Sequence, residues 1–229
     1  MSKNLQGILG PQYGKIGPVV GYTWKGKPCY RAYTNRGKQP NTLEQQIARA
    51  VFKTFNLLSC KFQPAINFGF LMKAASDKNT TRGVFVKVNS ELGVVTATTP
   101  DSVVIDYTAI ALAQGPLQQP FFGTPQSSTP AQIDVAITGN NFGDATVNDK
   151  IALVAYIPEL KLCIVDKTAT RATATGHITV PGAASSMKAH VWGFALAGVS
   201  EPTFIPDYGA DMLPGQCSDS MYIGEVTIS

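Results

Sequence analysis

Short apolar runs separated by turn residues fill the second half of the chain, and this pattern limits the possible folds more than any other feature. From residue 131 onward the runs are "AQIDVAIT", "KIALVAYIP", "ELKLCIVDKT", "ATGHITVPG", "SMKAHVWGFALAG" and "SMYIGEVTIS". In the first of them Ile133, Val135 and Ile137 alternate with polar residues, which is the period of a β-strand. About six or seven strands with turn signals roughly every 8–12 residues are typical of an antiparallel sandwich. We therefore predict an immunoglobulin-like β-sandwich over residues 116–229.

A long amphipathic helix is predicted before the sandwich, in "NTLEQQIARAVFKTFNLLSCKFQP". Thr42 followed three residues later by Gln45 matches a capping box, which marks the helix start. The apolar residues recur in steps of three and four, as one stripe of a helix requires. They are Leu43, Ile47, Val51, Phe55, Leu58 and Phe62. Pro64 is expected to end the helix, because it lacks a backbone donor and clashes with the preceding turn.

The segment between this helix and the sandwich is harder to interpret. Asn79 or Thr80 could cap a second helix that carries Val84, Phe85 and Val88, and a strand through "RGVFVKV" is the alternative. "DSVVIDYTAIALAQG" is rich in β-branched residues and is predicted to be a strand. The proline-rich "PLQQPFFGTPQSSTPAQ" indicates a linker or an interdomain strand entry.

These elements predict an α+β chain that is mostly β. We expect a basic glycine- and aromatic-rich arm or hairpin at 1–41, a helical and strand region at 42–115, and the sandwich at 116–229. The chain has 229 residues, enough to bury a sizeable core. A proline-containing loop at 198–217 interrupts the sandwich, and loops of that length are usually functional or disordered.

The first forty residues combine aromatic rings with cations and contain no acid. Residues 10–42 hold six lysines and arginines and no aspartate or glutamate. Over residues 1–82 the formal charge is +11, and over 83–229 it is −7, which favours partners of opposite charge at each end. Cations neutralise phosphates and rings stack on bases, so single-stranded nucleic acid is one candidate partner. The same stretch also fits two strands around the "KGKP" turn, with the rings in a core or at a subunit interface.

No catalytic, cofactor or metal site is predicted. His177 and His190 lie in expected strands without a carboxylate or cysteine at short spacing, so neither forms a recognisable site. "GPQYGKIG" lacks the spacing and the Ser/Thr of a phosphate-binding loop, and no GxSxG elbow is present. Cys29 has no histidine near it in sequence, and Asp207 and Asp211 lack the remainder of a calcium loop. The four cysteines are expected to be free thiols in a reducing compartment.

Several motifs resemble an uncharacterised family of Bacteroidota proteins that is known only as a domain of unknown function. They are a GKxGxVVGYxWKGK segment, an arginine soon after it, and a TxxQxxxR helix start. The matching residues are Gly14, Lys15, Gly17, Val19, Val20, Gly21, Tyr22, Trp24, Lys25, Gly26, Lys27, Arg31, Thr42, Gln45 and Arg49. "VIDYTAIALAQGPL", "NDKIALVAYIPE" and "DSMYIGEVTIS" are similar to the family too, whereas 198–217 is longer than usual. The resemblance implies an arm–helix–sandwich plan and no catalytic residues.

These observations lead to the hypothesis of a non-enzymatic structural protein that self-assembles, such as a virion or phage-like shell or filament component. It would be a homo-oligomer, located in the cytoplasm or in a virion-like particle assembled there, without cofactor or membrane. Nucleic-acid binding through the basic aromatic arm is the alternative, and a ligand-binding module with the 198–217 loop as a lid is a third. The residues expected to make assembly or nucleic-acid contacts are Tyr22, Trp24, Lys25, Lys27, Arg31, Arg36 and Lys38.

Overall fold

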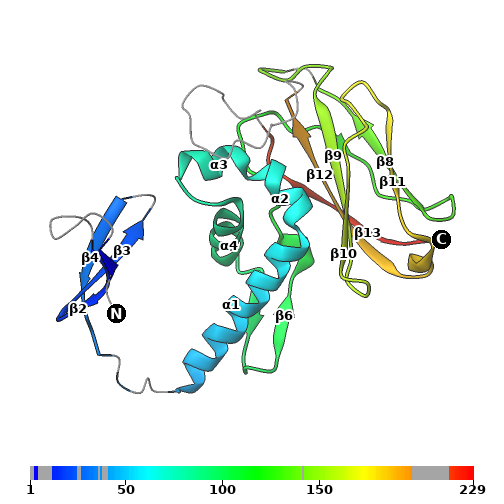
Figure 1. The fold of residues 1–229 in the computed structure, drawn as a ribbon. Helices are drawn as coiled ribbons and strands as arrows, with labels where there is room; N and C mark the ends of the chain where they lie inside the picture. The colour runs from blue at the N-terminus through cyan, green and yellow to red at the C-terminus, as the bar shows by residue number, and fades with distance from the viewer. Residues whose placement is uncertain are drawn as a thin grey trace. The chain divides into compact units, whose positions relative to one another are not determined.

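The computed structural model describes residues 3–4, 12–24, 27–35, 37, 41–140, 142–197 and 217–229 (Figure 1). The chain divides into two compact units, residues 1–42 and 43–229. We call them the sheet unit and the main unit. The predicted boundary between 115 and 116 lies inside the main unit.

The sheet unit is an antiparallel meander in the strand order β1-β2-β3-β4. Its strands are β1 Lys3–Asn4, β2 Gln12–Ile16, β3 Val19–Trp24 and β4 Lys27–Ala32. Gly17, in the turn between β2 and β3, has φ +56, a conformation that glycine adopts without a steric penalty. The two strands predicted around the "KGKP" turn are confirmed as β3 and β4.

Four helices open the main unit. They are α1 Leu43–Lys61, α2 Gln63–Gly69, α3 Leu71–Ser76 and α4 Thr81–Glu91. The predicted stripe of α1 is confirmed over its second half, where Phe55, Leu58 and the following Phe62 are buried. At the other end of the same stripe Leu43 is exposed. Pro64 lies in the first turn of α2, where a missing backbone donor has no cost, so the chain continues as a second helix.

The helix predicted after residue 79 is confirmed as α4, and the alternative strand through "RGVFVKV" is wrong. Thr80 is the N-cap, and the backbone N–H of Gly83 donates to its hydroxyl at 3.1 Å. Val84 and Phe85 are fully buried. The cap and this burial outweigh the low helix propensity of the glycine and the β-branched residues.

A small hairpin and a 3₁₀ turn follow the helices. The hairpin pairs β5 Val95–Ala97 with β6 Val103–Ile105, and η1 Tyr107–Ala109 comes next. The predicted strand over 101–115 is therefore correct only at β6. Asp106 ends the strand there, because its carboxylate accepts a hydrogen bond from the backbone N–H of Thr108 at 2.9 Å and starts the 3₁₀ turn.

The rest of the main unit is an antiparallel β-sandwich, as predicted. One sheet has the order β11-β8-β7 and the other β10-β9-β12-β13. The strands are β7 Phe121–Phe122, β8 Gln132–Thr138, β9 Lys150–Ile157, β10 Leu162–Asp166, β11 Thr175–Thr179, β12 Lys188–Leu196 and β13 Met221–Thr227, with η2 Gly182–Ala184 before β12. Successive strands change sheet between β8 and β9, between β10 and β11, and between β11 and β12. This exchange between a three- and a four-stranded sheet is the immunoglobulin-like arrangement.

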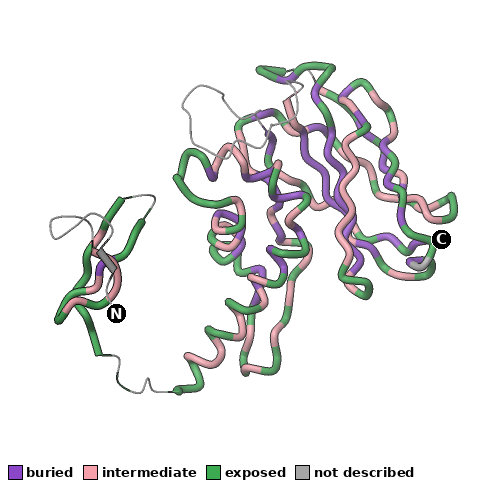
Figure 2. Tube along the Cα trace, in the orientation of Figure 1, coloured by how far each residue is buried: buried purple, intermediate pink, exposed green. Residues whose placement is uncertain are grey.

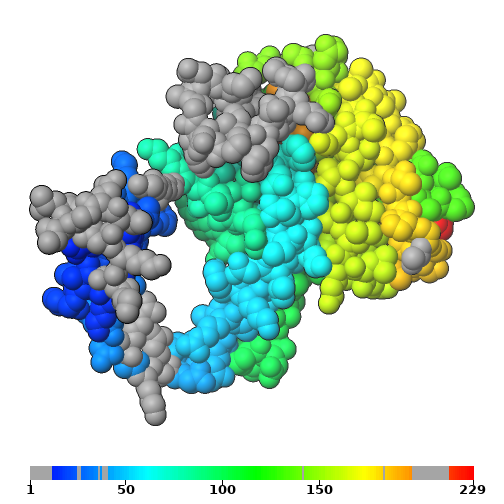
Figure 3. Space-filling model, viewed as in Figure 1, coloured from blue at the N-terminus to red at the C-terminus, as the bar shows by residue number. Residues whose placement is uncertain are grey.

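The four-stranded sheet is buried on both faces, so the main unit has three layers (Figures 1 and 2). Alternate residues of β9 point to opposite sides. Ile151 and Leu153 belong to the core between the two sheets, whereas Val154 and Tyr156 belong to the core beneath the helices. In the space-filling view the helical residues lie directly against those of the sandwich (Figure 3).

Candidate functional site

The strand register brings four of the predicted contact residues to one face of the sheet unit. Tyr22 pairs with Cys29, and Trp24 pairs with Lys27. Arg31 lies two residues beyond Cys29 on β4 and therefore points to the same side. We call the surface formed by Tyr22, Trp24, Lys27 and Arg31 the basic aromatic face.

The rings of this face are not enclosed by their own unit. Trp24 has 63% of its surface exposed and Tyr22 has 41%, and Lys27 and Arg31 are exposed as well. Among residues 12–24, 27–35, 37 and 41–42, for which burial is described, Gly21 is the one buried residue. A small sheet without a packed apolar face is only marginally stable in water. The described part of the sheet unit therefore presents large apolar side chains that no core within that part covers.

Lys15 and Tyr33 extend the basic aromatic face. Lys15 pairs with Val20, which is two residues before Tyr22 on the same strand. Its ammonium nitrogen lies 3.7 Å from the centroid of the Tyr33 ring, a distance typical of a cation–π contact. The interleaving of rings and cations in the sequence was the signal for such contacts, but it did not say which ring meets which cation.

The opposite face of the sheet unit depends on Gly21. Its register partner Tyr30 lies close by, and the Tyr30 hydroxyl oxygen accepts a hydrogen bond from the backbone N–H of Gln12 at 3.2 Å. A Cβ at Gly21 would come within 1.8 Å of the Gln12 carbonyl oxygen and 3.3 Å of the Tyr30 ring. Any larger residue at this position would push β2 away from β3.

Three further predicted contact residues, Lys25, Arg36 and Lys38, lie outside the described residues, as do Asp207, Asp211 and most of the 198–217 loop. The charge of the sheet unit is nevertheless clear from the sequence. Residues 1–42 contain seven lysines and arginines and no acid, whereas residues 43–229 contain twelve basic and fifteen acidic residues, a formal charge of −3.

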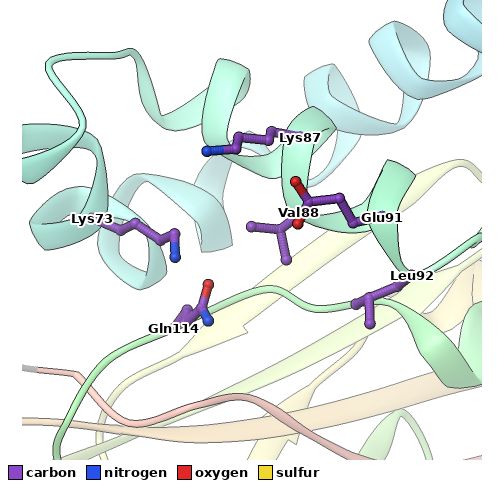
Figure 4. Close-up of a pocket in the computed structure, with 6 residues that line it drawn as sticks. All are labelled: Lys73, Lys87, Val88, Glu91, Leu92 and Gln114. Carbon is purple, nitrogen blue, oxygen red and sulfur yellow. The ribbon is translucent and has the colours of Figure 1, made fainter.

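The main unit has a small surface pocket between α3, α4 and the extended segment after η1 (Figure 4). Its volume is about 270 Å³, and it is lined by Lys73, Lys87, Val88, Glu91, Leu92 and Gln114. Figure 4 shows the amine of Lys73 and the side-chain amide of Gln114 turned toward the same space, with Lys87 and Glu91 reaching in from α4. Nothing in the sequence connected these residues, because they come from three separate segments.

The backbone fixes Gln114 in this pocket. Its N–H donates to the Gly69 carbonyl at 3.1 Å, and its own carbonyl accepts from the Cys217 thiol at 3.5 Å. The side-chain oxygen, Oε1, is buried and has no hydrogen-bond partner among the described residues. Lys87 is 3.9 Å from Asp77, and both side chains are partly exposed, so this ion pair holds the lysine only weakly.

The two histidines have local partners. Nδ1 of His177 lies 2.6 Å from Asp134 Oδ1 on the exposed surface of the three-stranded sheet. His190 stacks on Tyr107 with centroids 4.4 Å apart, and its Nδ1 lies 2.9 Å from the Tyr222 hydroxyl. Burial lowers the pKa of His190 below its ordinary value. In the described part of the chain no serine, threonine or cysteine side chain is hydrogen-bonded to either ring.

The four cysteines are free thiols, as predicted. Burial raises the pKa of Cys163 to about 12 and that of Cys217 to about 11, so neither forms a reactive thiolate near neutral pH. The described residues contain no group of three or more His, Cys, Asp or Glu side chains arranged to hold a metal ion. Among these residues, too, no helix has the length and apolar character needed to cross a bilayer.

The amino-acid sequence matches a known protein family. Residues 11–201 match the model of a family described as "Family of unknown function (DUF6266)". The match covers most of the chain, so the protein belongs to this family. Neither the search of curated proteins nor the search of solved structures gives a match.

Proposed function

We propose that this is a non-enzymatic structural protein that self-associates, with the sheet unit of one copy docking onto the main unit of another. The observation that carries this proposal is the exposure of Tyr22 and Trp24 on a sheet whose described residues form no core. Exposed rings beside arginine are typical of interface centres, where they become buried.

Charge supports a second copy as the partner. The sheet unit carries only positive charges, and the main unit has an excess of acids. Opposite charges steer two copies together and disfavour the pairing of two sheet units. Because the docking surface and its target are then different parts of the chain, the contact is head to tail and generates rings or open filaments.

A virion or phage-like shell, or a filament, is built from such head-to-tail contacts, and we propose this role in the cytoplasm or in a particle assembled there. The GKxGxVVGYxWKGK segment and the TxxQxxxR helix start are the basis for proposing a Bacteroidota origin.

Size-exclusion chromatography with light scattering on the full chain tests self-association. We expect oligomers that dissociate when Tyr22 and Trp24 are both replaced by serine. Thr23→Ser lies between them on the opposite face of β3 and is the matched control. A wild-type monomer at every protein and salt concentration would rule the proposal out.

The charge contribution has a test of its own. Lys27→Glu with Arg31→Glu should weaken the oligomer, because both cations belong to the basic aromatic face. Lys53→Glu with Lys61→Glu changes the net charge equally at two exposed positions of α1. Equal effects of the two pairs would mean that only net charge matters, and not the docking of this face.

Binding of single-stranded nucleic acid is a second candidate, favoured by the placement of rings and cations on one face. Bases would stack on Tyr22 and Trp24 while Lys27 and Arg31 neutralise phosphates. Fluorescence anisotropy with a labelled oligothymidine should give an affinity that falls steeply with salt. Trp24→Ala should cost about 1–3 kcal/mol, and Lys27→Ala should reduce the salt slope by about 0.7. An affinity that does not change with the salt concentration, or no binding at all, would rule out this candidate.

A further inference from the structure

We propose that the pocket between α3 and α4 binds a small hydroxylated anion, such as a sugar phosphate or a hydroxy acid. This inference concerns the main unit and is independent of how the sheet unit associates. The anionic group of the ligand would bind Lys73 and Lys87, which extend from two different helices into the pocket (Figure 4). Two ammonium groups provide several charge-assisted donors, which suit a phosphate or carboxylate.

Hydrogen-bond acceptors in the same pocket are the reason to expect hydroxyl groups on the ligand. Gln114 Oε1 is buried without a hydrogen-bond partner among the described residues, and a buried acceptor left unpaired is costly. Glu91 adds a carboxylate to the lining. An anion without hydroxyl groups, such as sulfate, would satisfy the lysines, but it would be repelled by Glu91 and would offer no donor to Gln114. A ligand that also carries hydroxyl donors satisfies both acceptors.

The dimensions limit the ligand to a small molecule. The volume of about 270 Å³ is below the roughly 300–1,000 Å³ of pockets for drug-sized ligands. The apolar contribution comes from Val88, in the last turn of α4, and from Leu92, its C-cap. They can pack against the carbon skeleton of a short hydroxylated chain.

Titration calorimetry on the full-length protein at low ionic strength tests the proposal with three probes. They are glycerol 3-phosphate, sulfate and glycerol. We expect saturable one-to-one binding of glycerol 3-phosphate, weaker binding of sulfate, which has no hydroxyl donor, and no binding of glycerol. Absence of saturable binding for glycerol 3-phosphate would overturn the proposal, and equal affinity for sulfate would overturn the role of the hydroxyl groups.

Three variants locate the site. Lys73→Ala with Lys87→Ala should weaken glycerol 3-phosphate binding by ~10-fold or more, since both charge-assisted contacts are lost. Gln114→Glu keeps the shape of the side chain and adds a negative charge, so it should also weaken binding; a circular dichroism melt verifies that it folds. Lys53→Ala with Lys61→Ala is the control, because it removes the same charge outside the pocket. An equal loss in the control would show non-specific attraction and would refute the site.

Discussion

The indole of Trp192 and the ring of Phe62 meet edge to face, with their centroids 5.5 Å apart and their planes at 82°. Phe62 follows α1, and Trp192 lies on β12. Both are fully buried, and Phe62 also lies 4.7 Å from the ring of Tyr156 on β9. This contact joins the helical layer to the outer face of the four-stranded sheet, so the helices and the sandwich share one core.

Replacing Phe62 by alanine should destabilise the main unit strongly. A large-to-small change at a fully buried aromatic residue typically costs about 3–5 kcal/mol, because burial is lost and a cavity remains. Phe52→Ala, on α1, is the matched control: Phe52 is 61% exposed, and its loss should cost about 0.5 kcal/mol or less. Urea unfolding followed by circular dichroism measures both. Similar losses in the two variants would contradict this account of the shared core.

A buried ion pair holds the loops at one end of the sandwich. Nε of Arg171 lies 2.8 Å from Asp149 Oδ2, and both side chains are almost fully buried. The same guanidinium donates to the carbonyl oxygens of Gln118 and Asn140. Thr146 binds the second oxygen of Asp149 through its hydroxyl at 2.7 Å. One arginine therefore connects three segments that are far apart in the sequence.

The two members of this pair should not contribute additively to stability. Arg171→Met leaves the Asp149 carboxylate buried without its main counter-charge, which typically costs about 3–5 kcal/mol. The double variant Arg171→Met with Asp149→Leu should lose less than the sum of the two single variants, because no unpaired charge remains. Denaturant unfolding of the four proteins gives this coupling energy. Additive losses would mean that the two side chains do not stabilise each other.

The inner face of the sandwich could be predicted from the sequence, but the covering of its outer face could not. Ile133, Val135 and Ile137 alternate, and all three are buried in the core between the sheets. In β9 the run "IALVAYI" is apolar at every position, which indicates burial on both faces. The run does not indicate which elements cover the second face. Helices α2 and α3 were not predicted, since segments of seven and six residues are too short for a clear helical period.

Only part of the candidate site could be predicted, because the hairpin turn decides which residues share a face. Tyr22 and Trp24 share a face of β3 by simple alternation, and so do Lys27 and Arg31 on β4. Whether the two pairs meet depends on the register, and a slip of one residue would turn the cations to the other face. All four residues are predicted contact residues, but their common face is known only from the pairing of Trp24 with Lys27.

The depressed pKa of His190 predicts a loss of stability in mild acid. Desolvation lowers this pKa most, Lys188 lowers it further, and Glu225 opposes the shift; the neighbouring Tyr107 and Tyr222 are phenols. As the pH falls through about 6.5, the ordinary pKa of histidine, this residue therefore takes up a proton in the unfolded chain before it does so in the folded chain. The contribution of His190 to the free energy of unfolding should be complete above pH 6.5 and should decrease below it. The decrease should stop once His190 is protonated in the folded state as well.

Unfolding in urea at pH 7.5 and at pH 5 measures this contribution. The free energy of unfolding should fall between the two values in the wild type, and the fall should be smaller in His190→Asn. Carboxylates such as Glu225, whose pKa is lowered by Lys188, lose their contribution mainly below this range. An unchanged pH dependence in His190→Asn would assign the loss to other groups.

Gly21→Ala should disrupt the sheet unit and leave the main unit intact. The added methyl group would overlap the Gln12 carbonyl oxygen, which lies 1.8 Å from the Cβ position, and press on the ring of Tyr30. Because the atom it meets is backbone, β2 must move, and its pairing with β3 is lost or shifted. Hydrogen exchange of the β3 amides should accelerate by ~10-fold or more, while the amides of β9 keep their protection.

Gly37→Ala is the matched control for this change, since a Cβ at Gly37 meets no atom within 4 Å. It should leave the exchange of β3 as it is in the wild type. If Gly21→Ala also left β3 protected, the close approach of β2 to β3 would not be required for the sheet. If it accelerated exchange and also dissociated the oligomer, the folded basic aromatic face, and not merely its cations, would be what the partner binds.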